Sequence, residues 1–169
     1  MLVVFGGLEG SMAIQAGNFW STNYYNNPPL TDEMVRVAEQ RLGVRLPAEY
    51  VDLLRRQNGG YTKRFAYPMA RPTSWAEDHV PLEELFGINV DAELGGHNIL
   101  DTGYMTEEWG LPDRQVLLAG DGHWWITLDY RRGSVPTVTW LDVECDEDFP
   151  LAPSFAEFLA ELRPLADFE

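Results

Sequence analysis

His123 is the residue whose type and neighbours best fit acid–base chemistry. It follows Asp121 and Gly122, and Trp125 and Asp129 fall at alternate positions behind it. A histidine beside a carboxylate is the pairing that a hydrolase uses for general acid–base catalysis. The Asp-Gly pair also fits a tight turn, which explains both residue types without chemistry and is the interpretation we favour. His123, Trp125 and Asp129 then share one strand face, which is either a binding surface or is covered by a helix or loop.

A second set of chemically capable residues is acidic and lies near the C-terminus. Asp142, Glu144, Asp146 and Asp148 alternate along the chain as ligands do in a calcium loop, but the central glycine and the closing glutamate of an EF-hand are missing. We therefore expect a solvated acidic loop over 142–148. Cys145 lies inside it, where negative neighbours raise the pKa of a thiol and make it a poor nucleophile.

Other catalytic and metal-binding patterns are missing from the sequence. His79, His97 and His123 are far apart, and neither a zinc-type spacing, a nucleophile elbow nor a phosphate-binding glycine loop occurs. The sequence therefore predicts no catalytic residues, no metal site and no cofactor.

These residues are positioned by a predicted antiparallel meander at the centre of a sheet. Two apolar runs within 115–130 meet at Asp121-Gly122, which predicts a hairpin with a two-residue type I′ turn. A third strand is expected over 135–143. Alternation along the second arm predicts a core face, formed by Trp124, Ile126, Leu128 and Tyr130.

Helix signals flank this sheet. Thr31 is a predicted N-cap and Gly43 a predicted C-terminal stop, and Pro47 then starts a second helix that ends at Asn58-Gly59-Gly60. Ser154 is expected to cap a final helix. Between these helices, 61–67 is a candidate strand, and 80–88 fits either a short strand or one helical turn.

Length and charge limit the function classes. A chain of 169 residues fits one domain, and its formal net charge is −15. Residues 61–169 hold 21 of the 27 acidic residues and 7 of the 12 basic ones. Such a surface repels nucleic acid and anionic membranes. It either attracts a basic partner or only keeps the protein soluble, and charge by itself favours the second interpretation. The single cysteine, the absence of any Lys or Arg before Arg36 and the lack of a long apolar run favour a cytoplasmic protein.

Four segments in a fixed order resemble the SUKH superfamily, which includes yeast cell-wall assembly regulators of the SMI/KNR type and many bacterial immunity proteins. The segments are AEQRLGVRLPAEYVDLLRRQNGG (38–60), LLAGDGHWWITLDYR (117–131), VTWLDVE (138–144) and LAPSFAEFL (151–159). The resemblance implies an α+β fold with no established enzymatic chemistry. It divides the chain into an N-terminal extension over 1–29 and one SUKH-like domain over 30–169.

The resulting fold prediction is one central, largely antiparallel sheet, with an N-terminal helical hairpin and a C-terminal helix packed around it. The functional hypothesis is a non-enzymatic cytoplasmic immunity protein that binds a basic toxin domain; many such toxins are nucleases. A regulatory scaffold with several partners and a hydrolase that uses His123 are the alternatives. The residues predicted to bind the partner are Trp75, Trp109, Asp121, His123, Trp125, Asp129, Asp142, Glu144, Asp146 and Asp148.

Overall fold

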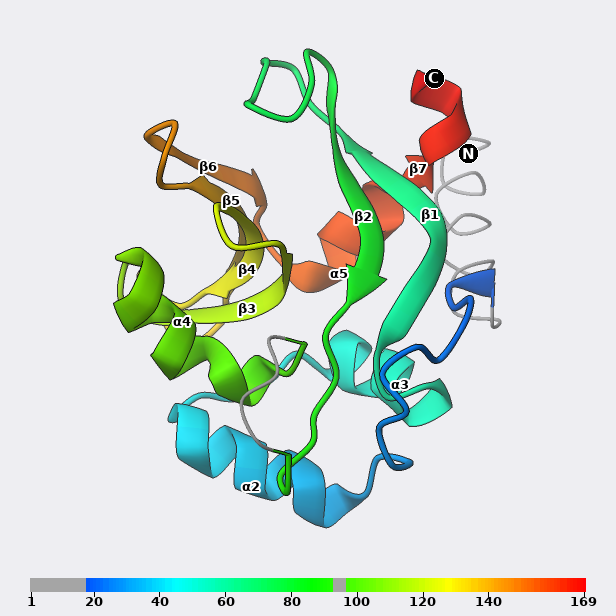
Figure 1. The fold of residues 1–169 in the computed structure, drawn as a ribbon, viewed down its shortest axis with the longest axis vertical. Coiled ribbons are helices and arrows are strands. Elements are labelled where there is room, and N and C mark those ends of the chain that lie inside the picture. The colour runs from blue at the N-terminus through cyan, green and yellow to red at the C-terminus, as the bar shows by residue number, and fades with distance from the viewer. Residues whose placement is uncertain (1–17, 93–96) are drawn as a thin grey trace, which may run out of the picture.

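The computed structural model describes residues 18–92 and 97–169 (Figure 1). Most of the predicted N-terminal extension, residues 1–17, lies outside the described residues.

The N-terminal helical hairpin consists of α2 (Asp32–Leu42) and α3 (Ala48–Arg56). The Thr31 hydroxyl accepts the N–H of Met34 at 3.2 Å and caps α2, and Gly43 ends it with a φ of 68°. Both predicted boundaries of α2 are therefore confirmed. Figure 1 shows the hairpin at one end of the strands.

The described strands form two antiparallel sheets. The first has the spatial order β2 (His79–Leu85), β1 (Gly60–Pro68) and β7 (Arg163–Pro164). The second has the order β3 (Gln115–Gly120), β4 (Trp124–Asp129), β5 (Thr137–Asp142) and β6 (Glu147–Ala152). The α+β class with antiparallel pairing is confirmed. The prediction placed the strands in a single sheet, whereas the structure divides them between two.

A local feature of the β2 edge explains this division. The sheets meet where the Phe86 N–H donates to the Leu118 carbonyl at 2.7 Å. Beyond that point β2 carries Pro81, which has no N–H to donate to a neighbouring strand. Proline is a feature of sheet edges for this reason, so the two edges separate.

The remaining helices cover the strands. They are η2 (Ile99–Asp101), α4 (Thr102–Trp109), α5 (Phe155–Glu161) and η3 (Leu165–Phe168). The predicted cap of the last helix is confirmed, because the Ser154 hydroxyl accepts the N–H of Glu157. Helix α5 contacts β1 and β5 and therefore buries Phe155 and Phe158 against both sheets. None of the described helices is long and apolar enough to cross a bilayer.

The central hairpin forms as predicted, but its turn is longer. Strand β3 ends at Gly120 and β4 begins at Trp124, so the turn has three residues. Gly122 has a φ of 122°, whereas Asp121 does not have the positive φ that a type I′ turn requires. The turn is organised by the Trp125 indole, whose Nε1 donates to the Gly122 carbonyl at 3.0 Å. The Asp121-Gly122 pair by itself does not predict this contact.

The predicted acidic loop over 142–148 is shorter than expected, because β6 begins at Glu147. The β6 sequence, EDFPLA, contains two acids and a proline, which are unusual in a central strand. Among the described strands, β6 pairs with β5 alone and lies at the edge of the sheet. An edge strand tolerates both residue types.

Candidate functional site

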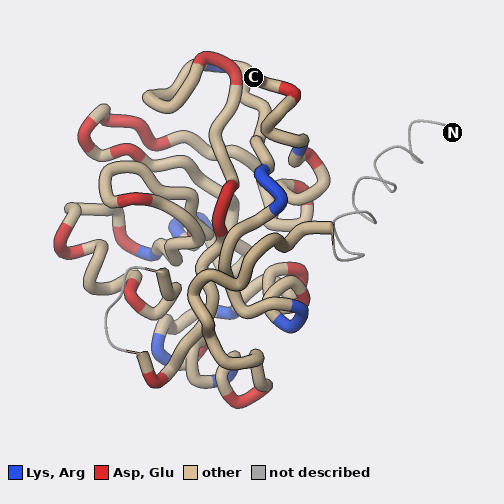
Figure 2. Tube along the Cα trace, turned by 45° about the vertical axis from the view of Figure 1, so that its right-hand side comes forward, with Lys and Arg blue, Asp and Glu red and all other residues tan. Residues whose placement is uncertain are grey.

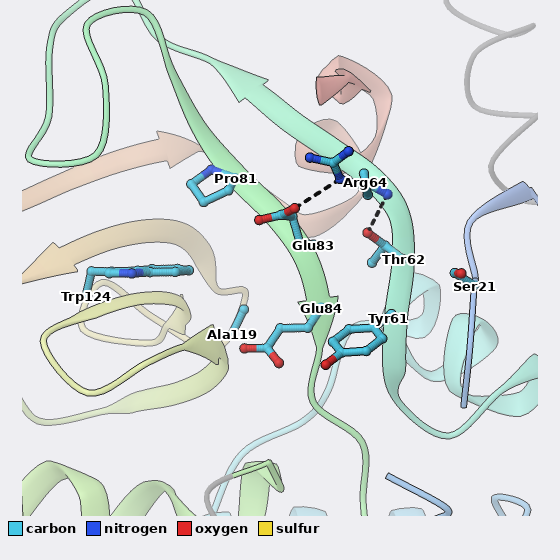
Figure 3. Close-up of a pocket in the computed structure, with 9 residues that line it drawn as sticks. All are labelled: Ser21, Tyr61, Thr62, Arg64, Pro81, Glu83, Glu84, Ala119 and Trp124. Atoms are coloured by element: carbon cyan, nitrogen blue, oxygen red, sulfur yellow. Dashed lines mark hydrogen bonds and ion pairs between the residues drawn. The ribbon is translucent and has the colours of Figure 1, made fainter. Parts of the chain in front are cut away.

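The main candidate site is the groove that opens between the edges of β2 and β3, which we call the sheet groove (Figure 3). It has a volume of about 420 Å³. One wall comes from the first sheet and the other from the central hairpin. The groove is lined by Ser21, Tyr61, Thr62, Arg64, Pro81, Glu83, Glu84, Ala119 and Trp124.

The hairpin wall of the sheet groove is aromatic. Trp124 stacks on Trp140 with ring centroids 5.1 Å apart and an interplanar angle of 12°, and Trp75 packs against it at 5.6 Å. The Nε1 of Trp124 is buried and has no hydrogen-bond partner among the described residues. Because Trp140 is fully buried, the stack fixes the Trp124 ring as a rigid surface in the groove.

The opposite wall is polar and acidic. Tyr61 is 41% exposed, and Glu83 and Glu84 follow Pro81 along β2. The Glu83 carboxylate pairs with Arg64 at 3.2 Å, and Glu84 accepts the Tyr25 hydroxyl at 2.6 Å. Burial, followed by this hydrogen bond to Glu84, raises the pKa of Tyr25 far above its ordinary value, so the tyrosine remains a donor. The groove therefore offers aromatic faces next to two carboxylates.

A second surface adjoins the groove at the turns of the second sheet. His123 lies between two carboxylates, with Nε2 3.6 Å from Asp121 and Nδ1 3.7 Å from Glu144. Trp109 lies against the turn, since a β-carbon added to Gly122 would be 3.0 Å from its ring. We call Trp75, Trp109, Asp121, His123 and Glu144 the turn face. It joins the sheet groove through Trp124, which contacts Trp75.

The turn face brings together five of the ten predicted partner-binding residues, and all five are exposed. The side chains of Asp121, His123 and Glu144 are 52%, 50% and 62% exposed. Trp75 and Trp109 are exposed on the loop before β2 and at the end of α4. Asp146 is also exposed, in the turn between β5 and β6.

The other predicted residues lie elsewhere. Trp125, Asp129 and Asp142 are buried, so the structure does not present them as contact residues. Trp125 is covered because its face of β4 packs into the core, where its ring lies edge-on to Phe86. Asp148 is exposed, but both of its oxygens accept hydrogen bonds from Arg131.

Asp129 instead organises a buried polar network. Burial by itself raises the pKa of Asp129, but hydrogen bonds from Arg131, Gln115 and Thr139 lower it to about 2. Burial likewise opposes ionisation of Asp142, yet donation by Ser74 and by the backbone N–H groups of Cys145 and Glu144 holds its pKa below the ordinary value. Both carboxylates therefore have a structural role in fixing neighbouring loops.

The geometry around His123 gives no support to the hydrolase alternative. Its ring lies on an exposed turn and does not line the sheet groove. Within residues 18–92 and 97–169, no three His, Cys, Asp or Glu side chains converge to hold a metal ion. Cys145 is exposed, and partial desolvation of its thiol together with the neighbouring Asp142 carboxylate raises its pKa, which agrees with its predicted poor reactivity.

Sequence reasoning missed the residues of the groove wall. Alternation along β4 predicts Trp124 on the core face, and neither Glu83 nor Glu84 is among the predicted site residues. The signal that could have found the groove is Pro81, because a proline inside an apolar strand indicates an exposed sheet edge. No sequence signal indicated that the β2 edge lies beside the central hairpin.

Comparison with known proteins agrees with this architecture. A family model described as the SMI1 / KNR4 family (SUKH-1) matches residues 29–161, which extend from just before α2 to the end of α5. No curated protein matches the chain. The match covers well over half of the 169 residues, and the chain therefore belongs to the SMI1 / KNR4 family (SUKH-1).

Proposed function

We propose that this chain is a non-enzymatic cytoplasmic immunity protein that neutralises a basic toxin domain by direct binding. The single observation that carries the proposal is the continuous surface formed by the sheet groove and the turn face. It presents the aromatic side chains of Trp75, Trp109 and Tyr61 beside carboxylates. Exposed aromatics supply contact area and stack with the cations of a basic partner, and the neighbouring carboxylates steer that partner toward the surface.

The charge distribution supports a basic partner. Figure 2 shows acidic residues on many loops and turns around the molecule. Within the turn face, Asp121 and Glu144 are exposed. Among the described residues, each of them pairs only with His123, which carries a positive charge only when it is protonated. A toxin domain with a basic substrate groove would meet complementary charge at this surface.

The experiment is a pull-down from the native host with the tagged full chain, at low and high salt. Three proteins are compared: wild type, the turn-face double variant Trp75→Ala with Glu144→Lys, and the control Tyr104→Ala with Asp52→Lys. Tyr104 is 48% exposed on α4 and Asp52 is exposed on α3, so the control loses an aromatic ring and reverses one charge away from the proposed site. We expect one basic partner that is lost at high salt and lost by the turn-face variant only.

Binding alone does not distinguish an immunity protein from a scaffold, so the captured partner is then expressed by itself and together with this chain. An immunity role requires that the partner is toxic alone and that the wild-type chain protects the cell. Several moderate partners without toxicity would contradict the immunity proposal and favour the regulatory scaffold. Equal capture by all three proteins would contradict the proposed surface.

A further inference from the structure

The molecule carries a further hollow, of opposite charge, at the open end of the central hairpin, where Arg114 precedes β3 and Tyr130 follows β4. Its volume is about 480 Å³, and we call it the arginine hollow. It is lined by Arg36, Glu39, Gln40, Gly43, Val44, Arg45, Arg114, Tyr130 and Ser134. Three arginines around one hollow are unexpected in a chain with 27 acidic and 12 basic residues.

Two of these arginines have no carboxylate partner among the described residues. Arg36 pairs with Glu33 on its own helix, whereas Arg45 and Arg114 form no ion pair with any described residue. The hollow contains one acid, Glu39, whose Oε2 accepts the backbone N–H of Leu46 at 2.7 Å. The guanidinium of Arg45 and the terminal nitrogens of Arg114 therefore keep their hydrogen-bond donors available although carboxylates are abundant on the surface.

Tyr130 holds both arginine-bearing segments in place. Its hydroxyl donates to the Arg45 carbonyl at 2.5 Å, and its own carbonyl accepts the Nε–H of Arg114 at 2.9 Å. The Tyr130 N–H also donates to the Arg114 carbonyl at 2.8 Å. Since Tyr130 is 1% exposed, these anchors are part of the core. The Nε contact fixes the plane of the Arg114 guanidinium and leaves its two terminal nitrogens for an external acceptor.

The backbone of Arg114 gives an independent indication of function. Its φ is 58°, in the left-handed region where glycine or asparagine is less strained than arginine. Strained residues of this kind concentrate at binding sites, because the structure must hold a particular side chain there. An arginine at such a position is explained if its guanidinium is needed in the hollow.

We propose that the arginine hollow binds one oxyanion group, a carboxylate or a phosphate, through the terminal nitrogens of Arg114 and the guanidinium of Arg45. A planar guanidinium forms paired hydrogen bonds with either group. The net charge of −15 repels anions at long range, so a free anion binds in the millimolar range and only at low salt. This site is separate from the sheet groove and does not depend on the proposed function.

The test is a titration of the ¹⁵N-labelled full chain at low salt, followed through the arginine Nε–H signals in NMR spectra. Inorganic phosphate and glutarate are the two probes, and they distinguish phosphate from carboxylate as the preferred group. We expect saturable shifts of the Arg45 and Arg114 signals with at least one probe. The variants are Arg114→Lys, which keeps the charge but loses the planar fork, and Arg45→Gln, which leaves the Arg114–Tyr130 contact intact.

The matched control is Arg56→Gln, because Arg56 is exposed on α3, outside the arginine hollow, and forms no ion pair with a described residue. We expect the dissociation constant to rise at least fivefold in Arg45→Gln and in Arg114→Lys and to stay within twofold of wild type in Arg56→Gln. Shifts that remain linear with both probes would overturn the proposal. Equal weakening in all three variants would also overturn it, because the effect would then come from net charge alone.

Discussion

A β-carbon added to Gly59 would lie 2.6 Å from the backbone nitrogen of Gly87. The chain therefore crosses itself here with no room for a side chain, just after the helical hairpin. Asn58 secures the crossing, since its side-chain oxygen accepts the Ile88 N–H and its amide donates to the Ile88 carbonyl, both at 2.8 Å. The Asn-Gly-Gly segment, which is part of the resemblance to the family, thus holds the end of the helical hairpin against the chain that follows β2.

Gly59→Ala is expected to destabilise the protein strongly. It places a β-carbon against backbone atoms at a φ of 88°, so we expect the free energy of unfolding to fall by about 2–4 kcal/mol. The matched control is Gly103→Ala in α4, where nothing lies within 4 Å of the added carbon. Alanine favours a helix, so the control gains about 0.5–1 kcal/mol. Urea denaturation measures the free energy of unfolding of both variants. Equal changes would contradict the close approach of Gly59 to the Gly87 backbone.

The two adjacent tryptophans of β4 are expected to respond differently to the same substitution. Trp125→Phe leaves a cavity in the core and removes the donor to the Gly122 carbonyl, so we expect a loss of about 2–3 kcal/mol. Trp124→Phe removes a nitrogen that has no partner among the described residues, at the partly exposed groove wall. Its expected cost is about 1 kcal/mol. Denaturant unfolding of both variants is the measurement, and a larger cost for Trp124→Phe would contradict these assignments.

Asp129 is expected to make stability depend on pH in the acidic range. Its pKa is about 2 in the folded protein and about 3.9 in an unfolded chain, so the ionised form favours folding. This stabilisation is complete above the unfolded pKa and is lost as the pH falls from about 4 through about 2. As the pH falls from about 4 to about 2, the free energy of unfolding of wild type should decrease by about 1–2 kcal/mol relative to that of Asp129→Asn. Denaturation at several pH values tests this, and a constant difference would show that Asp129 does not titrate as described.

Ser74 is expected to fasten the loop between β1 and β2 onto the second sheet. Its hydroxyl donates to Asp142 at 2.5 Å and its N–H donates to Glu147 at 2.8 Å. Ser74→Ala removes the first bond, so amide exchange over 70–78 should accelerate about tenfold. The control is Ser134→Ala, an exposed serine in the loop before β5. The measurement is hydrogen exchange followed by mass spectrometry. The same exchange rates over 70–78 in both variants would contradict the role of the Ser74–Asp142 hydrogen bond.

Much of the secondary structure followed from local chemistry. Thr31, Gly43 and Ser154 act through contacts within a few residues, so the helix ends that they define were predictable. The hairpin of β3 and β4 was predictable because alternating apolar residues flank an Asp-Gly pair. β6 was missed, since its acids and its proline make sense only once the strand is known to lie at an edge.

The sequence by itself determined the α+β class, the order of the helices and the central strands, and the acidic charge. Only the tertiary structure decided which residues face a partner. Trp124 and Trp125 are neighbours of the same type, yet one lines the sheet groove and the other is buried against Phe86. The difference arises because burial depends on which segments cover a strand, and Phe86 reaches Trp125 through a crossing of distant segments. Arg45 and Arg114 are likewise 69 positions apart, and the core tyrosine Tyr130 anchors both at one hollow.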